Sequence, residues 1–177
     1  TPDKMNELIF ITEEIEARIG RRLEVISGGA STSFWLVEKK KMPARINNLR
    51  IGGAMLIPSN LKQNFDCEMK GFHTDVFTLK AEVIEVKDKP SFPAGERTND
   101  CFGNHCEYLD RGVRRRALLA VGKLDVCFPD KLIPRLSGIE VLGGSSDHIL
   151  LDVEDNKDNI EVGDILEFYM TYAAMVF

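Results

Sequence analysis

The chain has 177 residues, enough for one domain or for two small ones. Hydrophobic residues make up 44% of it and charged residues 29%, a globular composition that argues against disorder. Its 23 Lys and Arg against 28 Asp and Glu leave a net charge of −5, which argues against nucleic acid as a partner because phosphate neutralisation needs a basic surface. No apolar run approaches the roughly 20 residues that a membrane-spanning helix needs, so no membrane partner is expected.

The cysteines indicate a reducing compartment. They have neither CxxC spacing nor the density of a disulfide scaffold, and no secretory leader opens the sequence. We therefore expect free thiols in a cytoplasmic protein. The sequence begins at Thr1 instead of a methionine, so we expect a processed chain or a piece of a longer one. The cysteines are Cys67, Cys101, Cys106 and Cys127.

The first segment is predicted to be a helix. Pro2 suits the first helical position, and Gly20 suits the residue after a helix end. Between them, apolar residues recur at spacings of three and four and form one stripe. The stripe consists of Met5, Leu8, Thr12, Ile15 and Ile19.

Two further strand signals flank a second helix. A β-prone run covers residues 23–27, and a helix is expected from about residue 34 to the lysines at 39–41. Residues 49–57 are apolar on both faces apart from Arg50. Such a run is typical of a strand buried on both sides, as in a parallel sheet covered by helices.

The pattern changes to that of an all-β domain after about residue 60. Residues 78–86 alternate apolar and polar side chains but shift phase at Ile84, which predicts a β-bulge or a sharp bend. The acidic segment 154–159 is predicted to be a solvated hairpin turn. Further strands are expected at residues 117–121, 139–142, 149–153 and 165–172.

These signals divide the chain into residues 1–60 and residues 61–177, an α/β segment followed by an all-β domain. Two βα units cannot close a barrel or cover both faces of a parallel sheet. They would leave unpaired strand edges and exposed apolar surface. We therefore expect the rest of an α/β domain to precede Thr1.

Two places in the first segment could bind an anion. The loop at 27–33, "SGGASTS", offers backbone N–H groups and hydroxyls that suit a phosphate, although a plain strand-to-helix loop favours the same residues. Arg50 would need a partner if it were buried, and Gly52-Gly53 would let a ligand approach the backbone. A structural ion pair at the strand end is the alternative for Arg50.

Several stretches resemble PLP-dependent amino-acid racemases of the alanine racemase superfamily, in the ornithine racemase-like branch. They are collinear and cover nearly the whole chain. The resemblance implies a TIM-type (βα)8 barrel that carries pyridoxal 5'-phosphate (PLP), followed by a C-terminal, β-barrel-like β-domain, in a homodimer acting on a free amino acid. The stretches include "LEVISGGASTSFWLVEKKKMPARINNLRIGGAML", "HTDVFTLKAEVIEVKDKPSFPAGE", "EYLDRGVRRRALLAVGKLDV", "LGGSSDHILLDV" and "VGDILEFYMTY".

The resemblance assigns cofactor-binding roles residue by residue. Ser31, Gly52, Gly53 and Tyr172 match phosphate-binding positions, and Arg50 matches the arginine that faces the pyridine nitrogen. A guanidinium cannot accept a proton and would therefore keep that nitrogen unprotonated. Residues 1–60 would then be the last two βα units of the barrel.

The catalytic groups depart from the family pattern. No segment matches the lysine that binds PLP, so the chain alone is expected to be inactive. Phe102 stands where the second base would be a tyrosine, and the neighbouring Cys101 is the candidate replacement, although a small cysteine also packs well in a core. Asp147 matches a position near the substrate carboxylate, and His148 beside it suits a turn.

Other interpretations stay open. The chain could be a non-catalytic dimerisation module, or part of another PLP-barrel enzyme such as a decarboxylase, which Arg50 disfavours because those enzymes place an acidic residue there. No metal site is expected, since Cys101 and Cys106 lack a usual zinc spacing. The arginines at 111 and 114–116 are expected to form a solvated or dimer-interface face, with Glu107 and Asp110 as acidic partners.

Overall fold

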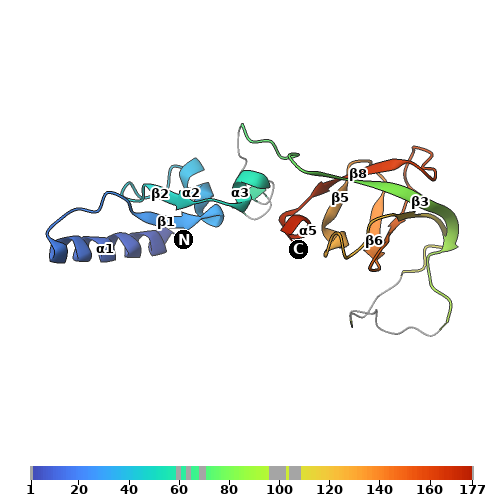
Figure 1. Cartoon of the computed structure of the whole chain (residues 1–177), viewed down its shortest axis with the longest axis horizontal. Coiled ribbons are helices and arrows are strands. Elements are labelled where there is room, and N and C mark those ends of the chain that lie inside the picture. Colours follow the sequence, from blue (N-terminus) through green and yellow to red (C-terminus); the bar gives the residue numbers. More distant parts are fainter. Residues whose placement is uncertain are drawn as a thin grey trace. The chain divides into compact units, whose positions relative to one another are not determined.

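The computed structural model of the chain describes residues 2–58, 61–62, 65–67, 71–95, 103 and 109–176. It divides into two compact units, Thr1–Val76 and Phe77–Phe177 (Figure 1), and each has a hydrophobic cluster of its own. The boundary expected between residues 60 and 61 lies earlier in the chain than this division.

Unit 1 alternates helices and short strands. The predicted first helix is confirmed, because α1 covers Pro2–Ile19 and Gly20 follows it with a φ of +67°, in the left-handed region that glycine tolerates. The two strands are parallel and pair with each other, with Ala30 opposite Arg50. The remaining elements are β1 (Ser27–Ala30), the 3-10 turn η1 (Ser31–Ser33), α2 (Phe34–Glu38), β2 (Asn48–Arg50) and α3 (Gly53–Leu56).

The prediction of one long strand through residues 49–57 is wrong. β2 ends at Arg50, and α3 begins at Gly53. Ile51 and Ala54 pack in one small cluster. Their spacing of three residues suits a helical turn as well as an apolar strand, so a continuous apolar run does not distinguish the two.

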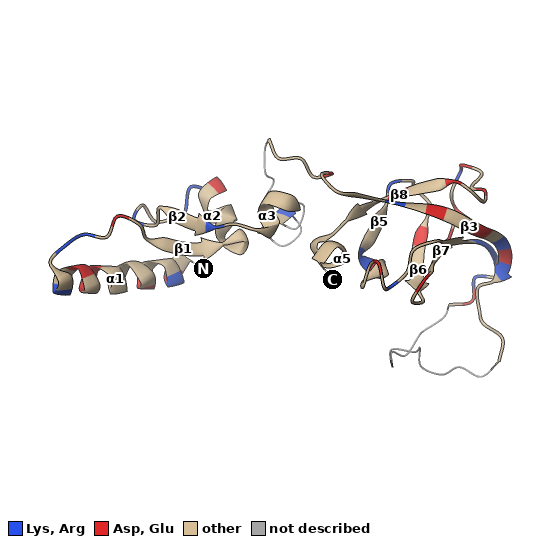
Figure 2. Ribbon diagram, viewed as in Figure 1, with Lys and Arg blue, Asp and Glu red and all other residues tan. Residues whose placement is uncertain are grey.

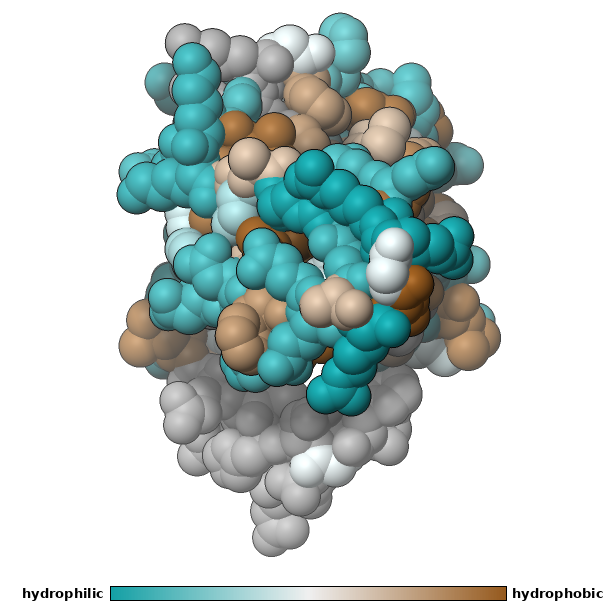
Figure 3. All heavy atoms as spheres, turned by 90° about the vertical axis from the view of Figure 1, so that its left-hand side faces the viewer, coloured by the Kyte–Doolittle hydropathy of each residue, from teal (hydrophilic) through white to brown (hydrophobic). Residues whose placement is uncertain are grey.

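The apolar stripe of α1 is covered over part of its length. Met5 packs with Ile26, Leu36 and Ile46 in a cluster that joins α1 and α2 to the strands. Ile15, farther along the helix, is 44% exposed. Figure 3 shows the end of unit 1, where brown apolar side chains lie exposed among the teal hydrophilic ones.

Unit 2 is an antiparallel sheet, which confirms the expected all-β character of this part of the chain. Within the described residues, six strands lie in the order β5-β8-β3-β4-β7-β6. The outer strands β5 and β6 contact each other, so the sheet is nearly closed. Its elements are β3 (Thr78–Pro90), β4 (Val113–Leu119), η2 (Pro129–Lys131), β5 (Leu132–Pro134), β6 (Glu140–Gly144), β7 (Ile149–Asp152), β8 (Ile165–Met170) and α5 (Tyr172–Val176).

The predicted bulge in β3 is confirmed at Ile84. Val83 lies opposite Leu119 and Glu85 opposite Leu118, so the register against β4 shifts between Val83 and Glu85. Residues 78–82 of the same strand pair instead with β8. The extra residue reverses the side-chain alternation and increases the local bend of the strand, which Figure 1 shows as a curved β3.

The sequence predicted a hairpin turn for the acidic segment 154–159, and this prediction is wrong. It joins β7 to β8, and these strands are not neighbours, since β7 pairs with β4 and β6 while β8 pairs with β3 and β5. The segment therefore connects two separate parts of the sheet. The short β5 and the helix α5 had no sequence signal of their own.

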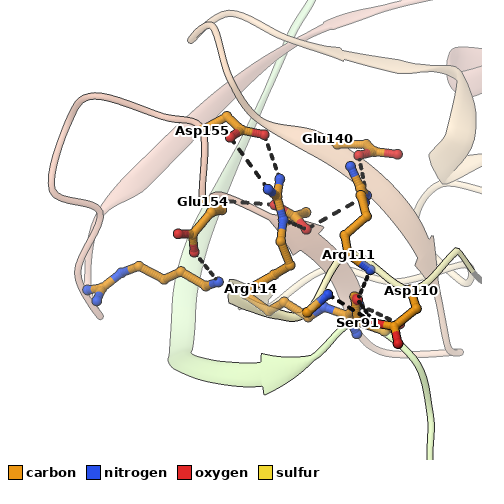
Figure 4. Close-up of polar contacts among 11 residues, drawn as sticks. Ser91, Asp110, Arg111, Arg114, Glu140, Glu154 and Asp155 are labelled. Carbon is orange, nitrogen blue, oxygen red and sulfur yellow. Dashed lines mark hydrogen bonds and ion pairs between the residues drawn. The ribbon is translucent and has the colours of Figure 1, made fainter.

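A charged network holds this connection to the sheet (Figure 4). The Arg114 guanidinium donates from Nε and Nη2 to the two carboxylate oxygens of Asp152, at 3.0 and 2.9 Å, and from Nη2 to Asp155. Arg111 donates to Glu140 at 2.7 Å. The Asp152 side chain is only 1% exposed, so its charge depends on these arginines.

The arginine cluster thus has other partners than the sequence suggested. Asp110 accepts hydrogen bonds from the Ser91 hydroxyl and the Gly112 N–H, and Glu107 lies outside the described residues. Glu154 accepts from the backbone N–H of Arg115. Charges of both signs gather here and at the end of β3 (Figure 2), and the carboxylates neutralise the charges of Arg111 and Arg114 within the domain.

Replacing Arg114 by leucine is expected to lower the free energy of unfolding by about 3 kcal/mol, because the Asp152 carboxylate stays buried without its main cation. Urea denaturation of the variant and the wild type measures the difference. The control is Lys131→Met, which removes an ion pair with two exposed side chains and should cost less than about 1 kcal/mol. Equal losses in both variants would contradict the role of Arg114.

Asp152 should also make the domain sensitive to acid. Burial raises the pKa of Asp152, but hydrogen bonds from Arg114 and the Glu154 N–H outweigh it, and the net pKa lies below the ordinary aspartate value. A lowered folded pKa contributes stability that is complete above the unfolded pKa of about 3.9 and is lost as pH falls through the folded value. Asp152→Asn should therefore lose less stability than the wild type between about pH 5 and pH 2. Thermal melting across that range tests this, and parallel curves would refute it.

Candidate functional site

The candidate site in unit 1 lies where its two parallel strands end. β1 ends at Ala30 and β2 at Arg50, and these residues are paired. Because parallel strands end at the same edge of a sheet, the loops that follow them meet there. The Ser31 Oγ accepts hydrogen bonds from the backbone N–H groups of Gly52 and Ala54, at 3.1 and 3.2 Å. The structure thus brings together Ser31 and the Gly52-Gly53 loop, as the sequence indicated.

The glycines before Ser31 are required by close packing. A Cβ on Gly28 would lie 2.7 Å from the Ile46 side chain. Gly29 has a φ of +97°, and its Cβ would lie 2.6 Å from the Ser33 hydroxyl. Gly52 is different, because a Cβ at this position would have no heavy atom within 4 Å. The loop is therefore packed against the core on one side and open on the other.

Arg50 lies exposed at the end of β2, not inside a buried strand. Its Nη1 donates to the Ser27 Oγ at 2.6 Å and to the Ser27 carbonyl at 3.5 Å. Within the described part of the chain, no carboxylate lies at ion-pair distance from it, so the structural ion pair considered for Arg50 is not formed there. The remaining guanidinium N–H groups can bind an acceptor.

Sequence reasoning missed the contact of Ser27 with Arg50 and the role of the Ala54 amide. Ser27 begins β1 and accepts a hydrogen bond from Arg50 at the end of β2. The Ala54 N–H donates to the Ser31 Oγ, which also accepts from the Gly52 N–H. Both contacts depend on the register in which β1 pairs with β2. That register is irregular between Ser27 and Ala30, and no local pattern in the sequence indicates it.

The other site candidates belong to unit 2. Asp147 lies exposed in the turn Ser145–His148 between β6 and β7, which closes through a hydrogen bond from the Ser145 N–H to the His148 carbonyl at 2.8 Å. The Asp147 carboxylate accepts a hydrogen bond from the Ser146 hydroxyl. Tyr172 is 40% exposed and opens α5, beyond the end of β8 at Met170. His148 takes part in the turn, as the sequence suggested.

Cys101 and Phe102 lie outside the described residues, so the prediction for the second base stays untested. Among the residues that the structure describes, no three His, Cys, Asp or Glu side chains are grouped so as to hold a metal ion. In the same described residues, no helix has the length and apolar character to cross a membrane.

Solved structures similar to the chain include a D-threonine aldolase and an alanine racemase. They include D-threonine aldolase from Filomicrobium marinum, with a TM-score of 0.54 and 14% identity over 89% of this chain and 36% of that one. Alanine racemase from E. faecalis has a TM-score of 0.50 and 15% identity, over 89% of this chain and 40% of that one. At such identities the likeness is one of fold.

The sequence comparison is more specific. The chain is 40% identical over 174 residues to ornithine racemase from Acetoanaerobium sticklandii, covering 98% of this chain and 48% of that protein. It is 41% identical over 176 residues to lysine racemase from Thermotoga maritima, covering 99% and 49%. No model of a known protein family matches it. The predicted resemblance to the amino-acid racemases is confirmed, and the chain spans about half the length of these curated relatives.

Proposed function

We propose that this chain is the C-terminal part of a PLP-dependent amino-acid racemase that acts on a free basic amino acid. The single observation that carries the proposal is the similarity to ornithine and lysine racemases along almost the whole chain. In this proposal residues 1–60 are the last βα units of a TIM-type barrel, and residues 61–177 are the β-domain. The active protein is a cytoplasmic homodimer.

The exposed surface of unit 1 supports the barrel assignment. In the described residues β1 and β2 pair only with each other, which leaves both outer strand edges unpaired. Ile11 and Ile15 on the flank of α1 are 45% and 44% exposed. A parallel sheet is normally covered on both faces and continued by further strands, so additional βα units would cover these side chains.

The loop around Ser31 fits a phosphate. The Gly52 and Ala54 N–H groups donate to the Ser31 Oγ and so orient the Ser31 hydroxyl, whose own proton is left to be donated to an anion. The open space at Gly52 leaves room for an anion to approach the backbone. An oriented hydroxyl donor beside open backbone can bind a phosphate oxygen without a full positive charge.

Arg50 suits the pyridine nitrogen of that cofactor. PLP supplies the electron withdrawal that makes the α-proton of an attached amino acid acidic. Arg50 can donate a hydrogen bond to the ring nitrogen but cannot give up its proton at neutral pH, which favours controlled proton removal and return over side reactions. Ser27 is a neutral partner and leaves the charge of Arg50 uncompensated.

Racemisation needs an acid or base on each face of the α-carbon. No segment of this chain matches the PLP-binding lysine, so we assign that group to the part of the protein outside this sequence, and the chain alone would be inactive. On the opposite face we assign the proton transfer to Cys101, with Asp147 near the substrate carboxylate. Tyr172 would add its hydroxyl to the phosphate site.

The decisive experiment measures racemisation of L-ornithine and L-lysine by the full-length protein with PLP. Ser31→Ala should raise the dissociation constant of PLP about tenfold, because the loop loses the side-chain donor to an anion. Titration followed by PLP absorbance measures that constant. Thr12→Val, which removes a hydroxyl that bonds within α1, is the control and should leave it unchanged. A wild type that binds PLP but racemises neither amino acid would refute the proposed activity.

The role of Cys101 is tested by Cys101→Ser in the same protein. A serine is a far weaker acid, so the rates from D to L and from L to D should both fall by about 10²–10⁴, the usual contribution of an acid or base. Cys127→Ser, at an exposed cysteine of the β-domain, is the matched control. Rates within about threefold of the wild type would show that another group transfers the proton.

A further inference from the structure

The turn that carries Asp147 is bound to a second turn, formed by residues 122–126 after β4. The N–H of Lys123 donates to the Ser145 carbonyl at 2.9 Å, and the N–H of Leu124 donates to the Ser146 carbonyl at 3.0 Å. Two consecutive backbone hydrogen bonds fix both the distance and the direction of one turn relative to the other. The two turns therefore form one unit.

Gly122 allows this approach because it has no side chain. A Cβ at this position would lie 2.2 Å from the Ser146 carbonyl oxygen and 2.5 Å from both the N and the carbonyl C of Asp147. These are backbone atoms, so no side-chain rotation could relieve the overlap. Its φ lies outside the left-handed region, so the need for glycine here is one of space and not of conformation.

The supporting turn is itself well anchored. The Asp125 carboxylate accepts from the Gly122 N–H at 3.0 Å, while the N–H groups of Asp125 and Val126 donate to the Gly122 carbonyl. Val126 is 1% exposed and belongs to the hydrophobic core of unit 2. These contacts fix the position of Gly122 relative to the core. The exposed turn Ser145–His148 is fixed in the same way, because it is bound to the turn that contains Gly122.

We propose that Gly122 is a positioning residue that fixes Asp147 for the amino-acid substrate. The inference rests on the proposed function, in which Asp147 lies near the substrate carboxylate. Within the described part of the chain, the Ser146 hydroxyl is the only side-chain group bonded to the Asp147 carboxylate, so the turn itself must set where that carboxylate lies. A methyl group at residue 122 would displace the turn by about 1 Å, and a misplacement of that size can cost about 10²-fold in rate.

The experiment compares two glycine variants in the full-length protein with PLP. Gly122→Ala should lower kcat for racemisation by about 10- to 100-fold while the PLP dissociation constant stays within about twofold. Gly138→Ala is the matched control, because its Cβ would lie 2.2 Å from the Asp155 carbonyl oxygen, at the other end of β6. It has a φ of +75° as well, so it should lower the melting temperature at least as much, yet keep kcat within about threefold.

A milder pair of variants covers the case in which Gly122→Ala does not fold. Asp125→Ala removes the acceptor for the Gly122 N–H and should lower kcat about three- to tenfold, whereas Asp125→Asn keeps an oxygen there and should restore most of it. Wild-type kcat and KM in Gly122→Ala, equal losses in both glycine variants, or no rescue by Asp125→Asn would each overturn the inference. Absence of racemisation by the wild type would instead overturn the proposed function.

Discussion

The pairing of one strand along both of its edges organises the β-domain. The first residues of β3 bond to β8 and the later ones to β4, with the bulge at Ile84 between the two regions. The other strands follow from this arrangement, since β5 pairs with β8, while β7 and β6 continue from β4. A regular strand would keep its side chains in one alternation along its whole length and could not bury apolar residues correctly in both halves.

A different constraint governs unit 1, where the parallel direction of two very short strands determines which residues meet. Ser31 and Gly52 are far apart in the sequence, but each follows the end of a strand, and the strands end at the same edge. The Ser31 hydroxyl oxygen then accepts hydrogen bonds from the backbone N–H groups of Gly52 and Ala54. Ser31, Arg50 and Gly52, the candidate residues of unit 1, thus lie at one edge of its sheet.

The features that the sequence predicted correctly are those with a local signal. Helix α1 has a stripe of helical period and a glycine at its end, and the bulge at Ile84 appears as a phase shift in a regular alternation. The candidate site residues of unit 1 were proposed because glycines and hydroxyls after a strand suit anion binding, and their role stays a prediction. Their assignment to PLP came from the resemblance, not from periodicity.

The features that it missed depend on which distant strands are neighbours. The segment 154–159 resembles a hairpin turn by composition, and only the strand order shows that it crosses between separate parts of the sheet. For the same reason the sequence did not indicate the ion pair of Arg114 with Asp152, because these residues lie on the neighbouring strands β4 and β7. The run after Arg50 was ambiguous because an apolar turn of helix and an apolar strand have similar composition over a few residues.

The shared strand β3 also has a consequence for how the protein is made. Its first half pairs with β8, which a ribosome synthesises some 80 residues later. During synthesis, β3 and β4 can associate early, whereas the other edge of β3 stays unpaired and its apolar residues stay exposed until β8 has been synthesised. The domain therefore completes its core only after β8 has been synthesised, and until then the nascent chain exposes an unpaired strand edge.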